Sequence, residues 1–453
     1  MSRNPSQLAR ARSDRASVLI IVLWVSLTLV TLTLLFGQSV MLSYRACDNA
    51  LAREQALQAA DGAVRYVTNL LANADEPGVF PSTDQYEAED LPVGEARLWL
   101  IGRDPEETLN ETTPYFGLVD EASKLNLNTA TAEMLEKLPG MTPELAAAIV
   151  DWRDEDDEPS PDGAESQAYE LGDNAYTCKN GPFESVEELA LVQGCTWEIL
   201  YGEDANRNGV LDPNENDGDA SWPPDDRDGV LDPGIIEYLT VWSREPNTQS
   251  DGSPRINVNG NRSQLVQLLT EKLGESKANQ AVQQIGNNTQ FRSALEFFIR
   301  SGLDPEDFAQ IEDAITVTNA SQLEGLVNVA TASETVLACL PGMDEAKASQ
   351  LVAHRSSLSE DQLNSVAWVA EALDAQDAVA IGPWITARSY QISVDAAAVG
   401  RNGRGYARVL TVVDLSGEAP EIVYRKDLSA LGWALGQAVL DQTAGSTAFA
   451  AAP

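Results

Sequence analysis

The sequence contains little of what most enzymes and nucleic-acid-binding proteins use. Its 453 residues include one histidine, His354, and four cysteines, none of them in a CxxC pair. No G-x-S-x-G, P-loop or HExxH pattern occurs, so we predict no enzymatic activity. Basic residues are also scarce: 30 Lys and Arg face 70 Asp and Glu, and the net charge is -40. Such a chain repels phosphate backbones, which argues against nucleic acid as a partner.

The N-terminus carries a basic head followed by a long apolar run. Four arginines precede residue 16, and residues 17–37 then contain no charged side chain. As a helix, a run of 21 residues is about as long as the hydrocarbon core of a bilayer is thick. We expect a retained membrane anchor, with the arginines in the cytoplasm and the rest of the chain outside it. The alternative is a cleaved secretory signal, which usually has a shorter apolar core and a small-x-small cleavage site.

The apolar run continues as an amphipathic helix. From Val40 to Leu71, apolar side chains recur at intervals of three or four residues, and no proline interrupts them before Pro77. We therefore predict one long helix, half of it in the membrane.

The order of basic leader, junction and long helix resembles that of type IV pilins and pseudopilins. In that class a prepilin peptidase cuts before the apolar run, which would place the cut between Ala16 and Ser17 and leave Ser17 as the mature, methylated terminus. The class usually has glycine before the cut and glutamate at the fifth mature position, where this chain has Ala16 and Ile21. A charge among apolar helices is costly unless it is paired, so a subunit without the glutamate suits the end of a filament.

Five short segments outside the helix alternate apolar and polar residues as strands do. They are residues 94–101, 115–119, 390–394, 407–413 and 421–424. A long helix on a small antiparallel sheet predicts the α+β class, a pseudopilin fold with a large inserted α-helical domain. The predicted divisions are a leader (1–16), a transmembrane segment (17–37), its amphipathic extension (38–75), the first part of the α+β domain (76–124), the insertion (125–387), the C-terminal strands (388–430) and a tail (431–453).

The predicted insertion contains an internal repeat. Residues 125–153 match residues 327–355 in register, each with a Leu-Pro-Gly-Met turn, and a weaker copy covers 256–269. A helix, a Pro-Gly turn and a second helix are typical of helix-hairpin-helix units. Such units either grip DNA phosphates through the N–H groups of the turn or form a compact scaffold. Proline removes one of these donors, and five acidic residues follow the first copy, so the charge favours the scaffold.

The most acidic stretch lies between the repeats, and part of it has the spacing of a calcium loop. Positions 1, 3, 5, 6, 9 and 12 are filled by Asp204, Asn206, Asn208, Gly209, Asp212 and Glu215, with the Val210 carbonyl at position 7. Short side-chain oxygens converge on a hard cation, Gly209 allows the sharp turn, and Glu215 closes the site with two oxygens. We predict a structural Ca²⁺ here; the alternative is a solvated acidic loop.

A second, incomplete copy of this pattern follows. Its ligands would be Asp226, Asp228, the Val230 carbonyl and Asp232. Since Ile235 stands at position 12, Glu237 would have to supply the missing oxygens.

Two of the four cysteines are close enough in sequence to form a bridge. Cys178 and Cys195 flank a short helical segment. In an oxidising compartment a disulfide between them would stabilise the fold by about 3 kcal/mol. A reduced pair is the alternative.

Several motifs in order resemble the general secretion pathway protein K family, the minor pseudopilins K of type II secretion systems. The motifs are DEASKLNLN at 120–128, LPGM at 138–141, DWRD at 151–154, PFESVEEL at 182–189 and VQG at 192–194. The resemblance covers nearly the whole chain and is densest from 115 to 202. It implies a place at the tip of the pseudopilus, which this subunit would initiate or cap for export of folded proteins across the outer membrane.

The resemblance also implies partners and location. The expected partners are the minor pseudopilins I and J, the inner-membrane secretion platform and the prepilin peptidase, with exported cargo a further candidate. The expected location is the bacterial inner membrane, with the bulk of the chain in the periplasm, and one or two structural Ca²⁺ ions. The main rival is a membrane-anchored helix-hairpin-helix protein that binds DNA for uptake. A second rival is a calcium-stabilised surface adhesion or scaffold module.

Overall fold

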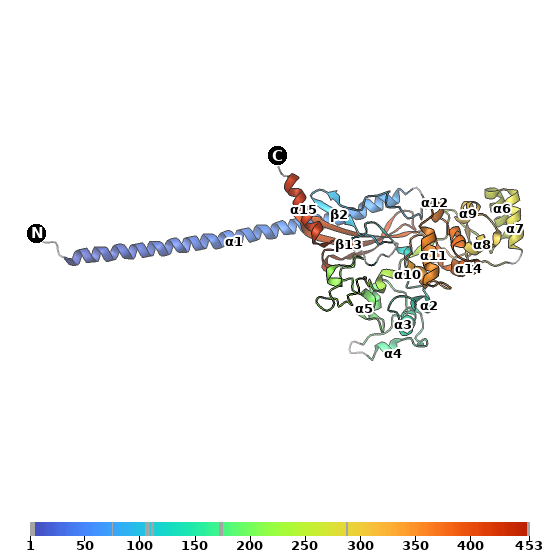
Figure 1. The fold of residues 1–453 in the computed structure, drawn as a ribbon, viewed down its shortest axis with the longest axis horizontal. Helices are drawn as coiled ribbons and strands as arrows, with labels where there is room; N and C mark the ends of the chain where they lie inside the picture. Colours follow the sequence, from blue (N-terminus) through green and yellow to red (C-terminus); the bar gives the residue numbers. More distant parts are fainter. Residues whose placement is uncertain are drawn as a thin grey trace.

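The computed structural model describes residues 5–450 except for 75, 105–108, 110–112, 172–174 and 287–288, without the side chains of 5–17 and 444–450. Its longest element is helix α1, Pro5–Ala72, of 68 residues. Figure 1 shows that its first half projects alone from the rest of the molecule. The described apolar side chains of this half, from Val18 to Phe36, are exposed, as expected of a membrane anchor. The predicted single long helix is confirmed.

Helix α1 packs on a six-stranded, largely antiparallel sheet. The strand order is β1-β2-β12-β13-β14, with the short β3 also paired to β12. The strands are β1 (Leu91–Val93), β2 (Ala96–Leu100), β3 (Val119–Asp120), β12 (Gln391–Gly400), β13 (Arg404–Asp414) and β14 (Glu421–Asp427). Four of the five predicted strands are found. The fifth prediction, 115–119, is wrong for most of its length: Phe116 forms a single bridge with Ile101, and only Val119 belongs to a strand.

Small residues let α1 approach the sheet closely. Its buried face is made largely of alanines, with Val67 and Leu71 near its end. The alanines pack on apolar residues of β12 and β13: Ala56, Ala59, Ala60, Ala63, Ile392, Val394, Ala396, Ala398, Ala407, Val409 and Val413. Gly405 has a φ of +60°, and a Cβ on it would clash with the backbone of Arg53. A side chain on Gly400 would clash with Ala52 in the same way. The turn between β12 and β13 therefore needs glycine where it meets the helix.

The other face of the sheet is covered as well, so β12 is buried on both sides. Trp99 and Val399 pack there with Trp433 and Leu435. Leu435 directly precedes helix α15, Gly436–Ala450. The sequence predicted a C-terminal tail from residue 431; the structure instead places this helix against the sheet, close to the point where α1 enters it (Figure 1).

The insertion consists of three similar units, each opened and closed by a pair of two-residue parallel strands. Unit 1 runs from β4 (Leu125–Asn126) to β5 (Leu239–Thr240) and contains α2 (Ala132–Leu135), α3 (Pro143–Arg153), α4 (Ser166–Tyr169) and α5 (Trp197–Tyr201). Unit 2 runs from β7 (Ile256–Asn257) to β8 (Ile315–Thr316) and contains α6 (Arg262–Leu273), α7 (Glu275–Ile285), α8 (Ala294–Ser301) and α9 (Pro305–Glu312). Unit 3 runs from β10 (Val327–Asn328) to β11 (Ile385–Thr386) and contains α10 (Glu334–Cys339), α11 (Glu345–Arg355), α12 (Glu360–Leu363), α13 (Val369–Ala372) and α14 (Ala375–Ile381).

The weak third repeat of the sequence is therefore a complete unit in the structure. The second residue of each unit is an asparagine, Asn126, Asn257 or Asn328, whose Oδ1 accepts a hydrogen bond from the N–H two residues on. In the two strong copies, an arginine at the end of the second helix donates to carbonyls at the start of the unit. Arg153 binds the carbonyls of Leu127 and Ala130, and Arg355 binds those of Val329 and Ala332. The assignment of these units to the helix-hairpin-helix class stays a prediction.

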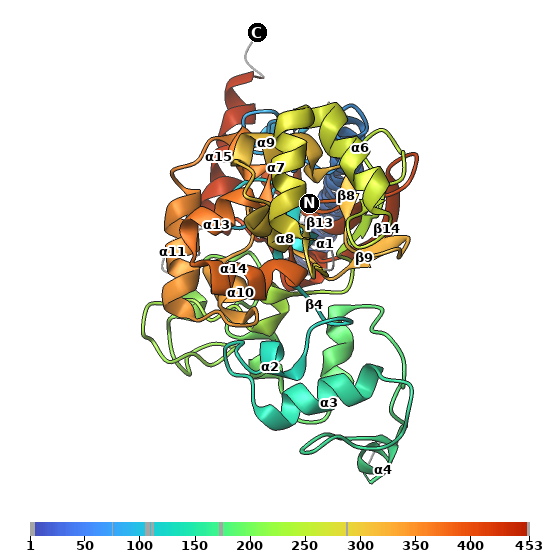
Figure 2. The same ribbon diagram turned by 90° about the vertical axis from the view of Figure 1, so that its right-hand side faces the viewer.

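Figures 1 and 2 show where the units lie relative to the anchor. Helices α6 and α7 of unit 2 form the end of the molecule opposite the anchor (Figure 1). In the end-on view, α2, α3 and α4 of unit 1 form a separate lobe below the rest (Figure 2). The insertion therefore makes the head wider than the helix and sheet alone.

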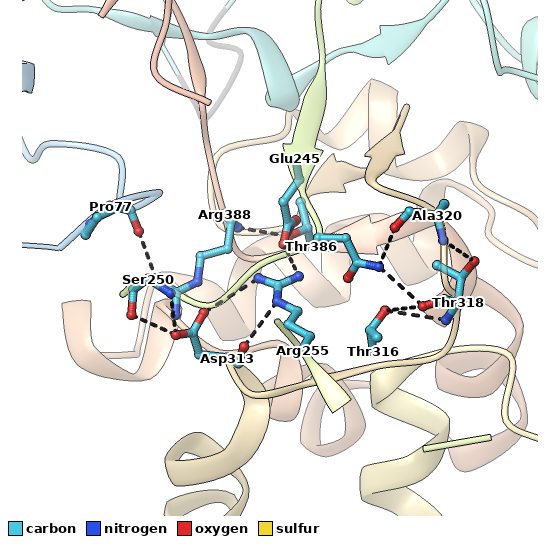
Figure 3. Close-up of polar contacts among 11 residues, drawn as sticks. Pro77, Glu245, Ser250, Arg255, Asp313, Thr316, Thr318, Ala320, Thr386 and Arg388 are labelled. Atoms are coloured by element: carbon cyan, nitrogen blue, oxygen red, sulfur yellow. Dashed lines mark hydrogen bonds and ion pairs between the residues drawn. The ribbon is translucent and has the colours of Figure 1, made fainter. Parts of the chain in front are cut away.

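A buried ion-pair cluster joins units 2 and 3 (Figure 3). Arg255 pairs with Glu245 at 2.7 Å, and both side chains are more than nine-tenths buried. Glu245 lies on β6 (Arg244–Pro246), which pairs with β9 (Gln322–Glu324). Its second oxygen accepts a hydrogen bond from the Thr386 hydroxyl at 2.9 Å, and Arg255 Nε donates to the Asp313 carbonyl at 3.1 Å. Because each charge has a partner, the cluster can stay buried and fix the two units against each other.

Candidate metal sites and membrane anchor

The predicted calcium loop is a buried turn closed by its own acidic residues. The Asp204 carboxylate accepts hydrogen bonds from the N–H groups of Asn208 (3.1 Å) and Gly209 (2.9 Å). Gly209 has a φ of +72°, which only glycine adopts without strain. At the other end, Glu215 Oε2 accepts from the N–H of Asp212 at 3.0 Å. The first and twelfth predicted ligands thus stand at the two ends of one folded turn.

The side-chain oxygens of this loop suit a hard cation such as Ca²⁺. The side-chain N–H groups of Asn206 and Asn208 both point to Asp212 Oδ2, at 2.7 and 3.1 Å, and Asn206 Oδ1 is buried without a hydrogen-bond partner. Burial raises the pKa of Glu215 to about 8, and the neighbouring charge of Asp204 adds to this rise. Burial likewise raises the pKa of Asp204. A cation among these oxygens would satisfy the unpaired amide oxygen and offset the repulsion between the carboxylates.

The loop is pinned to the sheet of the α+β domain. Arg408 on β13 forms a buried ion pair with Asp395 on β12 and donates to the Arg207 carbonyl at 2.6 Å. The side chain of Asn208 donates to the Ala434 carbonyl at 2.7 Å. Ordering of this loop therefore also orders the junction between unit 1 and the sheet. Val210, whose carbonyl is the seventh predicted ligand, is buried in the same turn.

The second predicted loop is less complete. Glu237 Oε1 forms an ion pair with Arg103 Nε at 2.8 Å, so the residue expected to close the loop is engaged elsewhere. The side chain of Val230 is 45% exposed. Asp226, Asp228 and Asp232 line one pocket together with Glu203. Glu203 Oε1 accepts a hydrogen bond from the N–H of Asp232 at 3.1 Å, as Glu215 does from Asp212 in the first loop, so Glu203 takes the closing position that Glu237 was predicted to fill.

Another group of carboxylates was missed by the sequence reasoning. Oxygens of Asp151, Asp154 and Glu165 lie within 4.8 Å of one another. Asp151 is in the last turn of α3, Asp154 follows that helix, and Glu165 precedes α4. Both oxygens of Glu165 and Oδ1 of Asp151 are buried without a hydrogen-bond partner. Burial raises the pKa of Glu165 to about 7. These oxygens also fit a hard cation.

The sequence gives little indication of this second group of carboxylates. The spacing of Asp151, Asp154 and Glu165 matches no metal-loop pattern, and acidic residues are abundant in the region. Their convergence depends on the chain from α3 returning past Gly163, where a side chain would clash with the Asp151 carboxylate.

The predicted disulfide is not formed in the structure. Cys178 and Cys195 are free thiols whose sulfurs lie near different carbonyls, that of Asp151 at 3.7 Å and that of Thr196 at 3.9 Å. Burial raises the pKa of both thiols to about 11. Because the thiolate is the species that forms a disulfide, this environment disfavours oxidation.

The lysines beside the two Pro-Gly turns, in units 1 and 3, are engaged within the protein. Lys137, beside the turn of unit 1, donates to the carbonyls of Leu340 (2.9 Å) and Met343 (3.1 Å) in unit 3. Lys347, beside the turn of unit 3, pairs with Asp377 at 2.8 Å. Lys137 therefore connects unit 1 to unit 3, and Lys347 forms an ion pair within unit 3. The sole histidine, His354, stacks on Trp368, with ring centroids 6.1 Å apart.

The anchor is the only helix in the described part of the chain that is long and apolar enough to cross a membrane. Its hydroxyl side chains donate to carbonyls four residues back: Ser26, Thr28, Thr31 and Thr33. These four hydroxyls are therefore satisfied within the helix, as a lipid environment requires. Ile21, at the fifth mature position, is 59% exposed. The side chains of Ala16 and Ser17 lie outside the described residues.

The structure has a long apolar helix over an antiparallel sheet, which is the arrangement that the pilin-type resemblance predicted, and the helix is consistent with a single membrane anchor. Residues 117–201 match the family described as type II secretion system (T2SS), protein K. This match, over 117–201, supports the predicted resemblance to the minor pseudopilins K of type II secretion. The family is a structural component of the secretion system, and the DNA-binding rival is not favoured.

No curated protein matches the chain. A solved structure that is similar in part is that of the GspK-GspI-GspJ complex from the type 2 secretion system of enterotoxigenic Escherichia coli. The likeness covers 83% of this chain and 96% of that chain, at 10% sequence identity and a TM-score of 0.41.

Proposed function

We propose that this minor pseudopilin occupies the tip of the pseudopilus, where it initiates or caps the filament. The observation that supports this position most directly is the three-unit insertion, which widens the head beyond the helix and sheet (Figure 2). In a shaft, successive subunits stack closely around packed anchor helices, and a head of this width would obstruct its neighbours. Ile21 adds to the argument, since a subunit without a charge at that position needs no pairing partner above it.

The proposed assembly contact is the apolar surface of α1. Leu27 and Leu34 lie on one face of the anchor, seven residues apart, and both are exposed in the isolated chain. In a bilayer this face would pack against the anchors of the minor pseudopilins I and J, which the family resemblance implies as partners. The inner-membrane secretion platform and the prepilin peptidase are further proposed partners, and exported proteins would meet the head in the periplasm.

We also propose that Ca²⁺ binds in the insertion and orders it. The loop of Asp204 and Glu215 offers one buried oxygen without a hydrogen-bond partner, Asn206 Oδ1. The group of Asp151, Asp154 and Glu165 offers three. The ion at the first site would hold unit 1 against the sheet through the loop that Arg408 binds. Its role would be structural, because neither site lies between the long paired helices of a calcium sensor.

The first test of the tip proposal is mass spectrometry of the mature N-terminus, with and without the prepilin peptidase. We expect a chain that begins at Ser17, free or methylated, only when the peptidase is present, and that then co-purifies with the I and J pseudopilins. A chain that keeps Met1 in both strains would contradict processing as a pseudopilin. Correct processing without any pseudopilin partner would instead support the surface-scaffold alternative.

A further inference from the structure

The two predicted calcium loops have the same backbone conformation. The first contains the run NRNGVLDP at 206–213, and the second contains DRDGVLDP at 226–233. Positive φ angles fall at equivalent positions in both runs, +57° and +72° in the first and +60° and +78° in the second, at Arg207, Gly209, Arg227 and Gly229. Because a positive φ is uncommon for arginine, its recurrence shows that the two loops fold alike.

The hydrogen bonds within the two turns also agree. In the first, the N–H of Val210 donates to Asn208 Oδ1 at 2.8 Å, and in the second the N–H of Val230 donates to Asp228 Oδ1 at 2.7 Å. These side-chain oxygens stand at position 5 of each loop. The second loop therefore has the turn geometry of the first, although Pro224 at its first position offers no side-chain oxygen.

Each turn is closed by a buried glutamate that bonds to the aspartate at position 9. Glu215 Oε2 accepts from the N–H of Asp212 at 3.0 Å, and Glu203 Oε1 accepts from the N–H of Asp232 at 3.1 Å. The N–H of Glu203 donates in turn to the Asp232 carbonyl at 2.8 Å. The other carboxylate oxygen of Glu203 accepts no hydrogen bond from the described residues. Glu203 can therefore supply the carboxylate that position 12 of the second loop, Ile235, lacks.

Glu203 connects the two loops, because it directly precedes Asp204, the first ligand of the first loop. Both side chains are buried. A side chain on Gly202 would clash with the Asp232 carbonyl, so the chain enters the first loop in close contact with the end of the second. A single peptide bond thus links the ligand sets of the two sites.

The chain that leaves the first loop is fastened to the second loop as well. Asp225 Oδ2 accepts hydrogen bonds from the N–H groups of Asp217 and Gly218, each at 2.8 Å. The Arg227 guanidinium donates to the Asp217 carbonyl, and a side chain on Gly218 would clash with that guanidinium. The two loops are therefore joined both where the chain enters the first loop and where it leaves, so that ordering of one restrains the other.

The repulsion between two bound cations is offset by the charge of the loops. Their carboxylates outnumber the four positive charges of two Ca²⁺ ions: Glu203, Asp204, Asp212, Glu215, Asp226, Asp228 and Asp232. A second ion therefore still enters a negatively charged environment.

We propose that the two loops form one calcium-binding unit, in which Glu203 closes the second loop and makes binding at the two sites cooperative. The inference rests on the calcium proposal above and adds the coupling between the sites. When Asp204 is held by an ion in the first loop, the backbone of Glu203 is fixed, and the second loop loses less conformational freedom as it closes. The coupling is reciprocal, since each site must favour the other by the same factor.

The test is a calorimetric Ca²⁺ titration of the full chain in detergent, from which metal has been stripped with a chelator. Every titration uses the Glu165→Gln background, which removes a ligand from the separate group at Asp151. Glu215→Gln then leaves the second loop alone, and Glu203→Gln leaves the first alone, because each removes the charge of one closing glutamate. Two ions should bind to the background protein. The product of their association constants should exceed the product of the two single-loop constants at least about fivefold.

A matched control and the melting curves separate the outcomes. Glu198→Gln, which removes an exposed carboxylate from the rim of the same pocket, should change neither constant. Melting curves in chelator report whether each variant is folded. One bound ion, or two with the constants of the single-loop variants, would overturn the coupling and leave the first calcium site in place. Two-ion binding at full strength in Glu203→Gln would overturn its assignment as the closing residue. Absence of any Ca²⁺ binding would refute the calcium proposal itself, and the coupling with it.

Discussion

At the scale of single residues, Asp120 fastens the sheet to unit 3. Its buried carboxylate accepts hydrogen bonds from Asn328 Nδ2 (3.0 Å), from the hydroxyl of Thr331 (2.5 Å) and from that of Ser389. Burial raises the pKa of Asp120 to about 6, although these hydrogen bonds lower it. Between its ordinary value of 3.8 and about 6, the folded chain therefore holds a proton that the unfolded chain has released.

The raised pKa of Asp120 makes the stability of the fold depend on pH. A raised carboxyl pKa makes the unfolding free energy fall as pH rises from about 4 to about 6, by up to about 2 kcal/mol from this residue. Asp120→Asn should remove that part of the slope in denaturant titrations of the full chain in detergent at several pH values. The control is Asp361→Asn, at an exposed position on α12. An unchanged slope in Asp120→Asn would show that Asp120 does not titrate in this window.

The calcium proposal is also tested at single residues. Calcium should raise the melting temperature of the full chain by several degrees, because an ion that binds only the folded state stabilises it by about 2.7 kcal/mol at a hundredfold excess over Kd. Asp204→Ala should remove the part of this gain that belongs to the loop, and Glu165→Gln the part that belongs to the α3–α4 group. The same melting curve in calcium and in chelator would refute both sites. Full gain in Glu165→Gln would assign the effect to the loop alone.

At the scale of elements, the prediction concerns the faces of α1. Leu27→Trp or Leu34→Trp should reduce secretion and co-purification with the I and J pseudopilins several-fold, because added bulk prevents close packing of anchors. Leu32→Trp is the matched control, since its side chain lies about 140° around the helix from that of Leu27. Ile21→Glu should have a smaller effect than either. Equal loss in all four variants would mean that the anchor has no preferred packing face.

Elements were largely predictable where their signal is local. The four strands β2, β12, β13 and β14 follow alternating patterns, and α1 follows an uninterrupted apolar period. Helix α15 was missed because it lacks a clear apolar period and a capping residue. The length of β12 was underestimated, since alanines such as Ala396 and Ala398 carry little strand signal and are buried only because α1 lies over them.

At the scale of the whole molecule, charge decides against nucleic acid. The net charge is -40, and the lysines near the Pro-Gly turns bind carbonyls or carboxylates of the protein. We expect the full chain in detergent to bind duplex DNA more weakly than the Kd of about 10⁻⁴ M that marks ordinary non-specific binding, even at low salt. A gel-shift titration at several salt concentrations measures this. Salt-dependent retardation would revive the DNA-uptake alternative.

The sequence by itself determined the features that depend on neighbouring residues. The apolar length of the anchor, the order of the repeats, the spacing from Asp204 to Glu215 and the missing glutamate at Ile21 are all visible in the printed chain. Each reflects local physics: a helix must match the thickness of the membrane, and a loop must place its oxygens within reach of one ion.

Only the tertiary structure decided which distant residues meet. It brought Glu165 to Asp151, paired Glu237 with Arg103, and placed the Glu203 carboxylate against the N–H of Asp232. In a chain with 70 acidic residues, the pattern of carboxylates alone does not reveal which of them converge. Their convergence depends on burial. A buried carboxylate needs a hydrogen bond, a cation or a proton, and the fold determines which of these is within reach.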